Sequence, residues 1–171
     1  MANLIMYYSR TGENYWDGSI RVIEKGNTER VAESIQEAVG GDLFRIETVE
    51  EYSPSYMTCI EEAKEELRQK ARPAIKAFVD GLDAYDTVFV GYPNWWGTAP
   101  MCVFTFLEHY DWVGKRIIPF CTSEGSGLGG SVRMLKQACP GAVVEDGLAI
   151  IGNQAERSRD RVAAWAKDMA R

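Results

Sequence analysis

Apolar and polar residues follow two alternating spacings along this chain. Short apolar runs, typical of buried strands, alternate with segments whose apolar residues recur every three or four positions, as on one face of a helix. The pattern predicts strands at residues 3–8, 43–49, 87–92, 116–121 and 142–151. It predicts helices at residues 27–39, 56–71, 100–110, 131–139 and 155–169. Pro119 in the fourth strand is expected to limit pairing there, because proline has no N–H group to donate.

Five strands that alternate with five helices indicate an α/β fold. Strands in this order are expected to be parallel, with right-handed crossovers and helices on both faces of the sheet. The expected fold is a doubly wound, three-layer α/β/α sandwich around a five-stranded parallel sheet. No linker or repeat interrupts the chain, so residues 1–171 are expected to form one domain. Ligands of such folds bind at the carboxyl ends of the strands, so the loops there are the first candidates for a site.

The loop after the first expected strand carries hydroxyl groups and leads toward a helix start. Ser9, Thr11 and Thr28 offer hydroxyls, Asn27 offers an amide, and Arg10 offers a positive charge. A helix N-terminus has unpaired N–H groups and the positive end of the helix dipole, so it can bind a phosphate. Ordinary helix capping would also explain Asn27 or Thr28. The GxxxxGK[ST] and GxGxxG motifs are absent, which argues against a triphosphate loop and a dinucleotide fold.

Two adjacent tryptophans follow the third expected strand. Trp95 and Trp96 stand between Pro93-Asn94 and Gly97, and they cannot both point into one core. An exposed indole favours a planar aromatic ligand stacked on it. Alternatively, one indole seals the end of the sheet and the other packs against a neighbouring loop.

The loop after the fourth expected strand is rich in glycine and hydroxyl groups, with the sequence TSEGSGLGG over residues 122–130. Glycine lets the backbone approach a ligand closely, so this loop is expected to border the edge of a heterocycle. A flexible connection is the alternative. Glu124 is the one carboxylate in the loop, and it is expected to be exposed to solvent. Together the three loops predict a site for a phosphorylated planar cofactor.

Composition narrows the classes of function that this chain can have. Its 19 basic and 25 acidic side chains give a net charge of −6, which disfavours nucleic acid and anionic membranes as partners. No apolar run approaches the roughly 20 residues that span a bilayer and no signal segment is evident, so a cytoplasmic protein is expected. The four cysteines lack a CxxC pair and His109 is the only histidine, so buried reduced thiols and no metal site are expected.

The order of these motifs resembles the flavodoxin-like family. The segments YYSRTG and GNT, then GYPNWWG, then PFCTSEGSGLG are similar to those of short-chain bacterial flavodoxins, which bind flavin mononucleotide (FMN). The resemblance covers essentially the whole chain. It implies the strand order 2-1-3-4-5, with the phosphate in the first loop and the isoalloxazine ring between the second and third loops.

The resemblance assigns candidate residues to the parts of FMN. The candidates for the phosphate are Ser9, Arg10, Thr11, Asn27 and Thr28. The candidates for stacking on the ring are Pro93, Asn94, Trp95, Trp96 and Gly97. The candidates for the ring edge are Thr122, Ser123, Gly125 and Ser126. Which tryptophan stacks on the ring stays open, and the backbone near Gly97 or Thr98 is a candidate partner of the flavin N5.

The chain departs from the family pattern at residues 13–25, which separate the hydroxyl loop from the helix start. Asp17-Gly18 between strand-forming residues is typical of a type I′ hairpin. A hairpin leaves and returns to one point, so the two halves of the phosphate loop can still converge. Thr11 could then belong to the stem of the hairpin. Tyr15 or Trp16 lies over the cofactor or contacts a partner, unless the hairpin is a surface decoration.

The resemblance implies an electron-transfer protein that works through non-covalently bound FMN, with no catalytic residue of its own. The alternative is an NAD(P)H-dependent FMN oxidoreductase of the quinone reductase type, which fold alone does not separate from a carrier. A receiver-type signalling module is disfavoured, because Tyr7-Tyr8-Ser9 and Pro93-Asn94 lack the acidic residues that it needs. The acidic balance of the chain implies redox partner proteins with basic docking surfaces.

Overall fold

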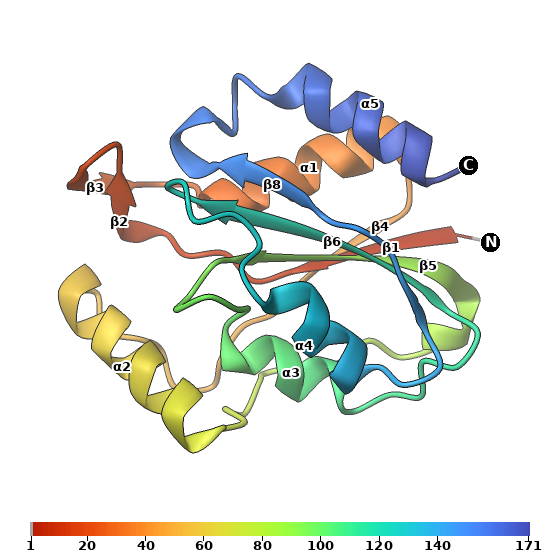
Figure 1. Ribbon diagram of the computed structural model, residues 1–171, viewed down its shortest axis with the longest axis horizontal. Helices are drawn as coiled ribbons and strands as arrows, with labels where there is room; N and C mark the ends of the chain where they lie inside the picture. The colour runs from red at the N-terminus through yellow and green to blue at the C-terminus, as the bar shows by residue number, and fades with distance from the viewer. Residues whose placement is uncertain (1) are drawn as a thin grey trace.

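A parallel sheet forms the centre of the molecule. The computed structural model describes residues 2–171 (Figure 1). The strands lie in the order β4 (Asp42–Arg45), β1 (Ala2–Tyr7), β5 (Tyr85–Pro93), β6 (Arg116–Ser123) and β7 (Val143–Val144), and β8 (Leu148–Ile151) also pairs with β6. All of these pairs are parallel. With β7 and β8 counted as one interrupted strand, the order is 2-1-3-4-5, which confirms the predicted fold.

Helices cover both faces of this sheet. The helices α1 (Asn27–Val39) and α5 (Arg159–Met169) lie on one face, and α2 (Tyr56–Gln69), α3 (Met101–Leu107) and α4 (Ser131–Ala138) lie on the other (Figure 1). Successive side chains of a strand point to opposite faces, so β5 serves both layers. Val88 and Val90 pack with the buried side of α3, whereas Phe89 packs in the layer of α1 and α5. The β-branched and aromatic residues that predict a buried strand here are therefore buried on both sides.

The fifth predicted strand is interrupted opposite Pro119. β7 pairs with Arg116 and Ile117, and β8 pairs with residues from Phe120 to Ser123. On the other edge of β6 the ladder to β5 continues, with Pro119 opposite Val90. Pro119 therefore limits pairing on one side of its strand only. Proline has no N–H group, so Pro119 cannot donate a hydrogen bond to the strand on that side.

Several elements end earlier or begin later than the periodicity predicts. The predicted strand 43–49 ends at Arg45, although the Ile46 N–H still donates to the Tyr7 carbonyl at 2.8 Å. The last helix begins at Arg159 instead of residue 155, because a 3₁₀ helix (Gly152–Gln154) and a turn precede it. A second 3₁₀ helix (Leu82–Ala84), which the pattern does not predict, leads into β5.

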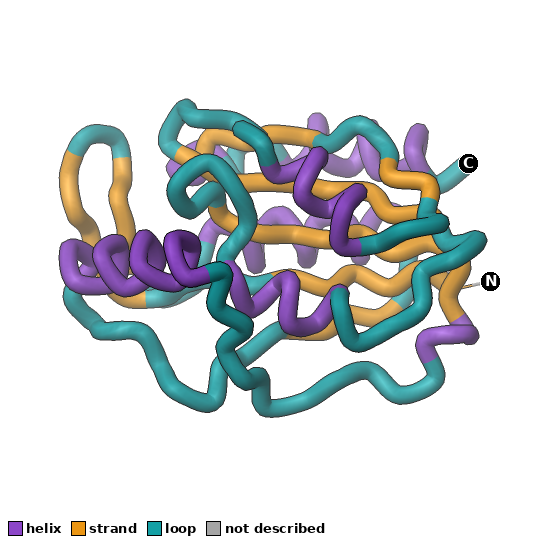
Figure 2. The backbone as a smooth tube through the Cα atoms, turned by 60° about the horizontal axis from the view of Figure 1, so that its bottom comes forward, coloured by secondary structure: helices purple, strands orange, loops and turns teal. Residues whose placement is uncertain are grey.

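Residues 12–23 form a hairpin of β2 (Gly12–Trp16) and β3 (Ser19–Ile23), separate from the main sheet. Asp17 and Gly18 have φ angles of 47° and 89°, as a type I′ turn requires. Figures 1 and 2 both place the hairpin beside α2, at the end of the molecule where β1 ends. The insertion therefore stands over the edge of the sheet where a ligand is expected.

The four cysteines and His109 lie outside the lining of the cavity described below. All four cysteines are free and buried. His109 follows α3 and stacks on Phe78, with 3.9 Å between the ring centroids. Among residues 2–171, no helix is long and apolar enough to cross a membrane. The same residues contain no cluster of side chains that could hold a metal ion.

Candidate functional site

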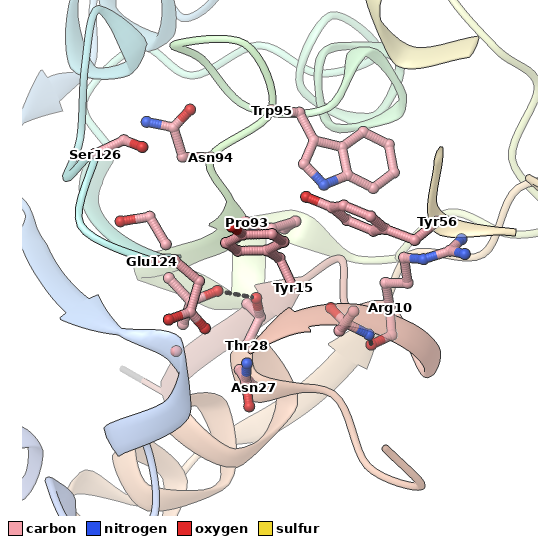
Figure 3. A pocket seen from close by; sticks show the side chains of 14 residues that line it. Arg10, Tyr15, Asn27, Thr28, Tyr56, Pro93, Asn94, Trp95, Glu124 and Ser126 are labelled. Carbon is pink, nitrogen blue, oxygen red and sulfur yellow. Dashed lines mark hydrogen bonds between the residues drawn. The ribbon is translucent and has the colours of Figure 1, made fainter. Parts of the chain in front are cut away.

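The three loops that the sequence singles out meet around one cavity of about 320 Å³ at the carboxyl ends of β1, β5 and β6 (Figure 3). The cavity is lined by Arg10, Asn14, Tyr15, Asn27, Thr28, Tyr56, Pro93, Asn94, Trp95, Thr122, Ser123, Glu124, Ser126 and Gly152. Nine of the predicted site residues are among them. Ser9, Thr11, Trp96, Gly97 and Gly125 are not.

The two halves of the first loop touch each other at the start of α1. The Ser9 hydroxyl oxygen accepts a hydrogen bond from the Glu29 N–H at 3.1 Å, and thereby satisfies one of the unpaired groups of the helix. Gly26 caps the helix so close to this loop that a Cβ there would lie 2.0 Å from the Ser9 hydroxyl oxygen. Ser9 is buried and lines a neighbouring cavity, so it shapes the helix start without lining this one.

The first residues of α1 point donors at the cavity. Asn27 and Thr28 both line it, and their N–H groups precede the first hydrogen bond within the helix. The Thr28 hydroxyl is buried and lies 2.7 Å from the hydroxyl of Thr122 (Figure 3). This contact links the helix start to the end of β6. The arrangement fits an anion held by neutral donors and the helix dipole.

Arg10 lines the cavity but is bonded to backbone carbonyls, and Thr11 lies outside the cavity. The Arg10 guanidinium donates to three backbone carbonyls, those of Glu13 at 2.9 Å, Ser53 at 2.9 Å and Pro54 at 3.2 Å. Arg10 therefore fixes the base of the hairpin to the loop before α2. Thr11 lies at the hairpin stem and lines a neighbouring cavity.

The two tryptophans diverge. Trp95 borders the cavity and packs edge-on against Tyr8 and Tyr52, at centroid distances of 5.2 and 5.0 Å. Trp96 is 47% exposed and turns toward α2, where its indole N–H donates to the Ile60 carbonyl at 2.7 Å. Trp95 at the sheet end agrees with one part of the alternative interpretation, whereas the second indole contacts helix α2 and not a neighbouring loop. Trp95 is the tryptophan that can contact a ligand in the cavity.

The second and third loops are hydrogen-bonded directly to each other at one side of the cavity. The Asn94 amide donates to the Gly127 carbonyl at 2.7 Å, and its oxygen accepts from the Gly97 N–H at 2.8 Å. The Ser123 hydroxyl accepts from the N–H groups of Gly125 and Gly127. These bonds make the glycine-rich loop an ordered wall. They also occupy the Gly97 N–H, one of the backbone groups near Gly97 or Thr98 that are candidate partners of the flavin N5.

Five lining residues lie outside the predicted set: Asn14, Tyr15, Tyr56, Glu124 and Gly152. Tyr15 stacks on Tyr56, with ring centroids 6.0 Å apart and an interplanar angle of 27°. The Glu13 carboxylate accepts a hydrogen bond from the Tyr56 N–H at 2.8 Å, so the hairpin also caps α2. The turn signal at Asp17-Gly18 could have placed Tyr15 near the site. Nothing in the local pattern marks Tyr56, because its position depends on this docking.

The expectation that Glu124 is exposed is wrong. One of its carboxylate oxygens accepts hydrogen bonds from the Asn153 amide at 2.6 Å and from the Asp17 N–H at 3.4 Å. Its other oxygen, Oε1, is buried without a hydrogen-bond partner. The bond to Asp17 ties the tip of the hairpin to the loop after β6. The hairpin consequently crosses one side of the cavity and is held at both ends.

Burial disfavours the ionised form of two groups near the cavity. Burial raises the pKa of the Tyr56 hydroxyl. Burial also raises the pKa of the Cys121 thiol, in the strand that leads to the cavity, to about 12. Both groups are therefore neutral near pH 7.

Comparison with known proteins identifies the family of the chain. Residues 22–169 match the family model described as flavodoxin, so the chain belongs to the flavodoxin family. Among solved structures, a candidate flavoprotein from Bacteroides eggerthii is 32% identical, with a TM-score of 0.78 over 99% of this chain and 98% of the other. None of the curated proteins matches the chain.

Two more distant structures share the fold. A flavoprotein from Lactobacillus acidophilus in complex with FMN is 22% identical, with a TM-score of 0.65 over 91% of this chain and 97% of the other. A flavodoxin from Fusobacterium nucleatum bound to FMN is 13% identical, with a TM-score of 0.54 over 99% and 98%. The strand order and the position of the cavity agree with this family assignment.

The close contact at Gly26 gives a prediction for stability. A Gly26→Ala variant should be less stable than Gly130→Ala by about 1–3 kcal/mol, because the new methyl group overlaps the Ser9 hydroxyl. Gly130 is a matched control: it also caps a helix, and its Cβ would meet two atoms at ordinary contact distances of 3.7 and 3.8 Å. Urea unfolding of the two variants measures the difference. Equal stabilities would mean that the two halves of the loop are not in contact.

Proposed function

We propose that this protein binds FMN in the cavity at the strand ends and acts as a flavodoxin-type electron carrier. The observation that carries the proposal is the composition of the cavity, in which neutral donors at the start of α1 lie beside an aromatic wall and a polar loop. Membership of the flavodoxin family supports FMN as the ligand. The FMN complexes of the Lactobacillus and Fusobacterium proteins support it as well.

The lining residues fit the three parts of FMN. The N–H groups of Asn27 and Thr28 would hold the phosphate. The Lys25 ammonium, close by in the sequence, does not line the cavity and is paired with the Glu33 carboxylate at 2.6 Å. Trp95 would border the ring, and Ser126 would lie along its polar edge. Bound FMN would supply the redox chemistry, while the protein fixes its position and its electrostatic surroundings.

The hairpin favours a carrier over an NAD(P)H-dependent reductase. Hydride transfer needs a nicotinamide stacked on the flavin with the reacting atoms about 3–3.5 Å apart. Tyr15 stands on the side of the cavity toward solvent, is 42% exposed and is backed by Tyr56. The contact between Asp17 and Glu124 holds the hairpin there. A cofactor behind this wall would exchange electrons through an exposed edge, without a stacked dinucleotide.

The charge of the chain suits a basic redox partner. The net charge is −6, and α2, beside the cavity, carries Glu61, Glu62, Glu65 and Glu66. Opposite charges on two proteins speed their encounter at low ionic strength. We therefore propose a partner whose docking surface is basic.

The phosphate assignment predicts a selective effect of charge. Thr28→Glu adds a carboxylate beside the proposed phosphate, and a like charge there should weaken FMN binding by about 100-fold or more. Riboflavin lacks the phosphate, so its affinity should change less than about threefold. Fluorescence titration with both flavins measures the two affinities. Equal losses for both flavins would place the phosphate elsewhere.

The aromatic wall predicts a non-selective effect. Tyr15→Ala should lower the affinities for FMN and riboflavin by the same factor, about 3–10-fold, because only a ring contact is lost. Tyr15→Phe should bind as the wild type does. Ile20→Ala is a matched control, because Ile20 lies opposite Tyr15 in the hairpin and does not line the cavity. If Tyr15→Ala binds both flavins normally, the hairpin does not cover the ring.

The carrier role predicts a slow direct reaction with NADPH. In a stopped-flow experiment, anaerobic FMN-loaded protein and NADPH should show little loss of flavin absorbance over minutes. Adding a catalytic amount of a flavoprotein reductase should make reduction fast. Rapid stoichiometric bleaching by NADPH alone would instead favour the reductase.

A further inference from the structure

A second cavity lies beside the one proposed for FMN, at the carboxyl ends of β1 and β4. Its volume is about 540 Å³, which is within the range of small-molecule sites. Its lining comes from residues 8–12 after β1, from residues between 45 and 54 at and after the end of β4, and from Lys76. Arg10 lines both cavities, so the loop after β1 stands between them.

Two hydroxyl groups in this second cavity are left without a partner. Tyr8 and Thr48 line the cavity, and each is only 7% exposed. Within residues 2–171 neither side-chain hydroxyl makes a hydrogen bond, although the Tyr8 ring packs edge-on against Tyr52 and Trp95. A hydroxyl that is enclosed by protein and has no partner costs free energy. Two of them in one cavity therefore indicate a ligand that hydrogen-bonds to both.

Arg10 adds a positive charge to the same cavity. Its guanidinium donates through Nε and Nη2 to three backbone carbonyls, and no carboxylate in the described part of the chain pairs with it. In Figure 3 the guanidinium is turned away from Asn27 and Thr28, the residues proposed for the phosphate. An arginine held by carbonyls keeps its full charge and further N–H donors, so it is prepared to bind an anion.

The lining of the second cavity is positive, whereas the chain has a net charge of −6. Three basic and two acidic side chains line it: Arg10, Arg45, Lys76, Glu47 and Glu51. The Arg45 guanidinium is paired with the Glu29 carboxylate at 3.3 Å, and the Lys76 ammonium with that of Glu47 at 3.5 Å. Arg10 is therefore the cation of this lining whose charge is left for a ligand.

The other part of the wall is apolar, with Ile46, Pro54 and the ring of Tyr52 beside that of Tyr8. Hydroxyl donors and a cation next to apolar surface suit an anion that has an apolar body. We propose that the second cavity binds a small organic carboxylate. Its oxygens accept hydrogen bonds from the hydroxyls of Tyr8 and Thr48 near the charge of Arg10, and its body lies against the apolar wall. This inference does not depend on the binding of FMN.

Benzoate, a carboxylate on an apolar ring, is the probe for this site. Isothermal titration calorimetry of the wild-type protein should show one bound benzoate per chain, both without FMN and with FMN in excess. The two affinities should agree within about threefold, because the cavities are separate. Acetate has the carboxylate without the ring, so it should bind at least about 10-fold more weakly.

Two variants test the hydroxyls. Tyr8→Phe and Thr48→Val each remove one hydroxyl and nearly keep the shape of the side chain. Each should weaken benzoate binding by about 10-fold or more, because a hydrogen bond to a charged acceptor is lost. Tyr85→Phe is the matched control: its hydroxyl lies at the start of β5, where it bonds to Asp42, and this variant should bind benzoate as the wild type does. Urea unfolding of all three variants detects any general loss of structure.

The other outcomes overturn the inference. Loss of benzoate binding in the presence of FMN would place the carboxylate in the first cavity. Unchanged affinity in Tyr8→Phe and Thr48→Val would remove the hydroxyls from the site, and equal affinities for benzoate and acetate would remove the apolar wall. A wild-type protein that does not bind benzoate would contradict the proposal as a whole. Failure of the proposed function is a different result, because the protein would then bind benzoate but not FMN.

Discussion

The contact between Ser9 and the start of α1 is the constraint on which the site depends. The hairpin separates the two segments in the sequence, yet the Ser9 hydroxyl caps the Glu29 N–H and leaves no space for a side chain at Gly26. This contact fixes the start of α1 beside the cavity. It also holds together the two ends of the segment that contains the hairpin. The insertion could therefore be added without moving the donors that a phosphate needs.

The hairpin also forms one wall of the cavity. Three attachments fix it: Arg10 at its base, Glu13 on the N-terminus of α2, and Asp17 on Glu124. Each is a hydrogen bond to or from a backbone group or a buried carboxylate, so the hairpin is supported by its neighbours and not by its own two strands. An isolated two-stranded hairpin is marginally stable in water, which makes these supports necessary. They place Tyr15 against Tyr56 at the mouth of the cavity.

The sequence predicts the fold better than it predicts the site. Strands such as β5 are apolar on both faces, so their burial and their order follow from local pattern and from the rules for crossovers. The loops were predicted as a group because ligands gather at the carboxyl ends of parallel strands. The direction of each side chain was not, since it depends on contacts between distant segments. Three side chains illustrate this dependence. The Trp96 indole donates to the Ile60 carbonyl, the Arg10 guanidinium donates to backbone carbonyls, and the Glu124 carboxylate accepts from the Asn153 amide.

The central claim is that the cavity holds FMN, and titration of the wild-type protein with FMN tests it most directly. Stacking against aromatic side chains quenches flavin emission, so FMN emission is expected to be quenched until one FMN is bound per chain, with weaker binding of riboflavin. Emission that does not change at protein concentrations well above that of the flavin would contradict the account.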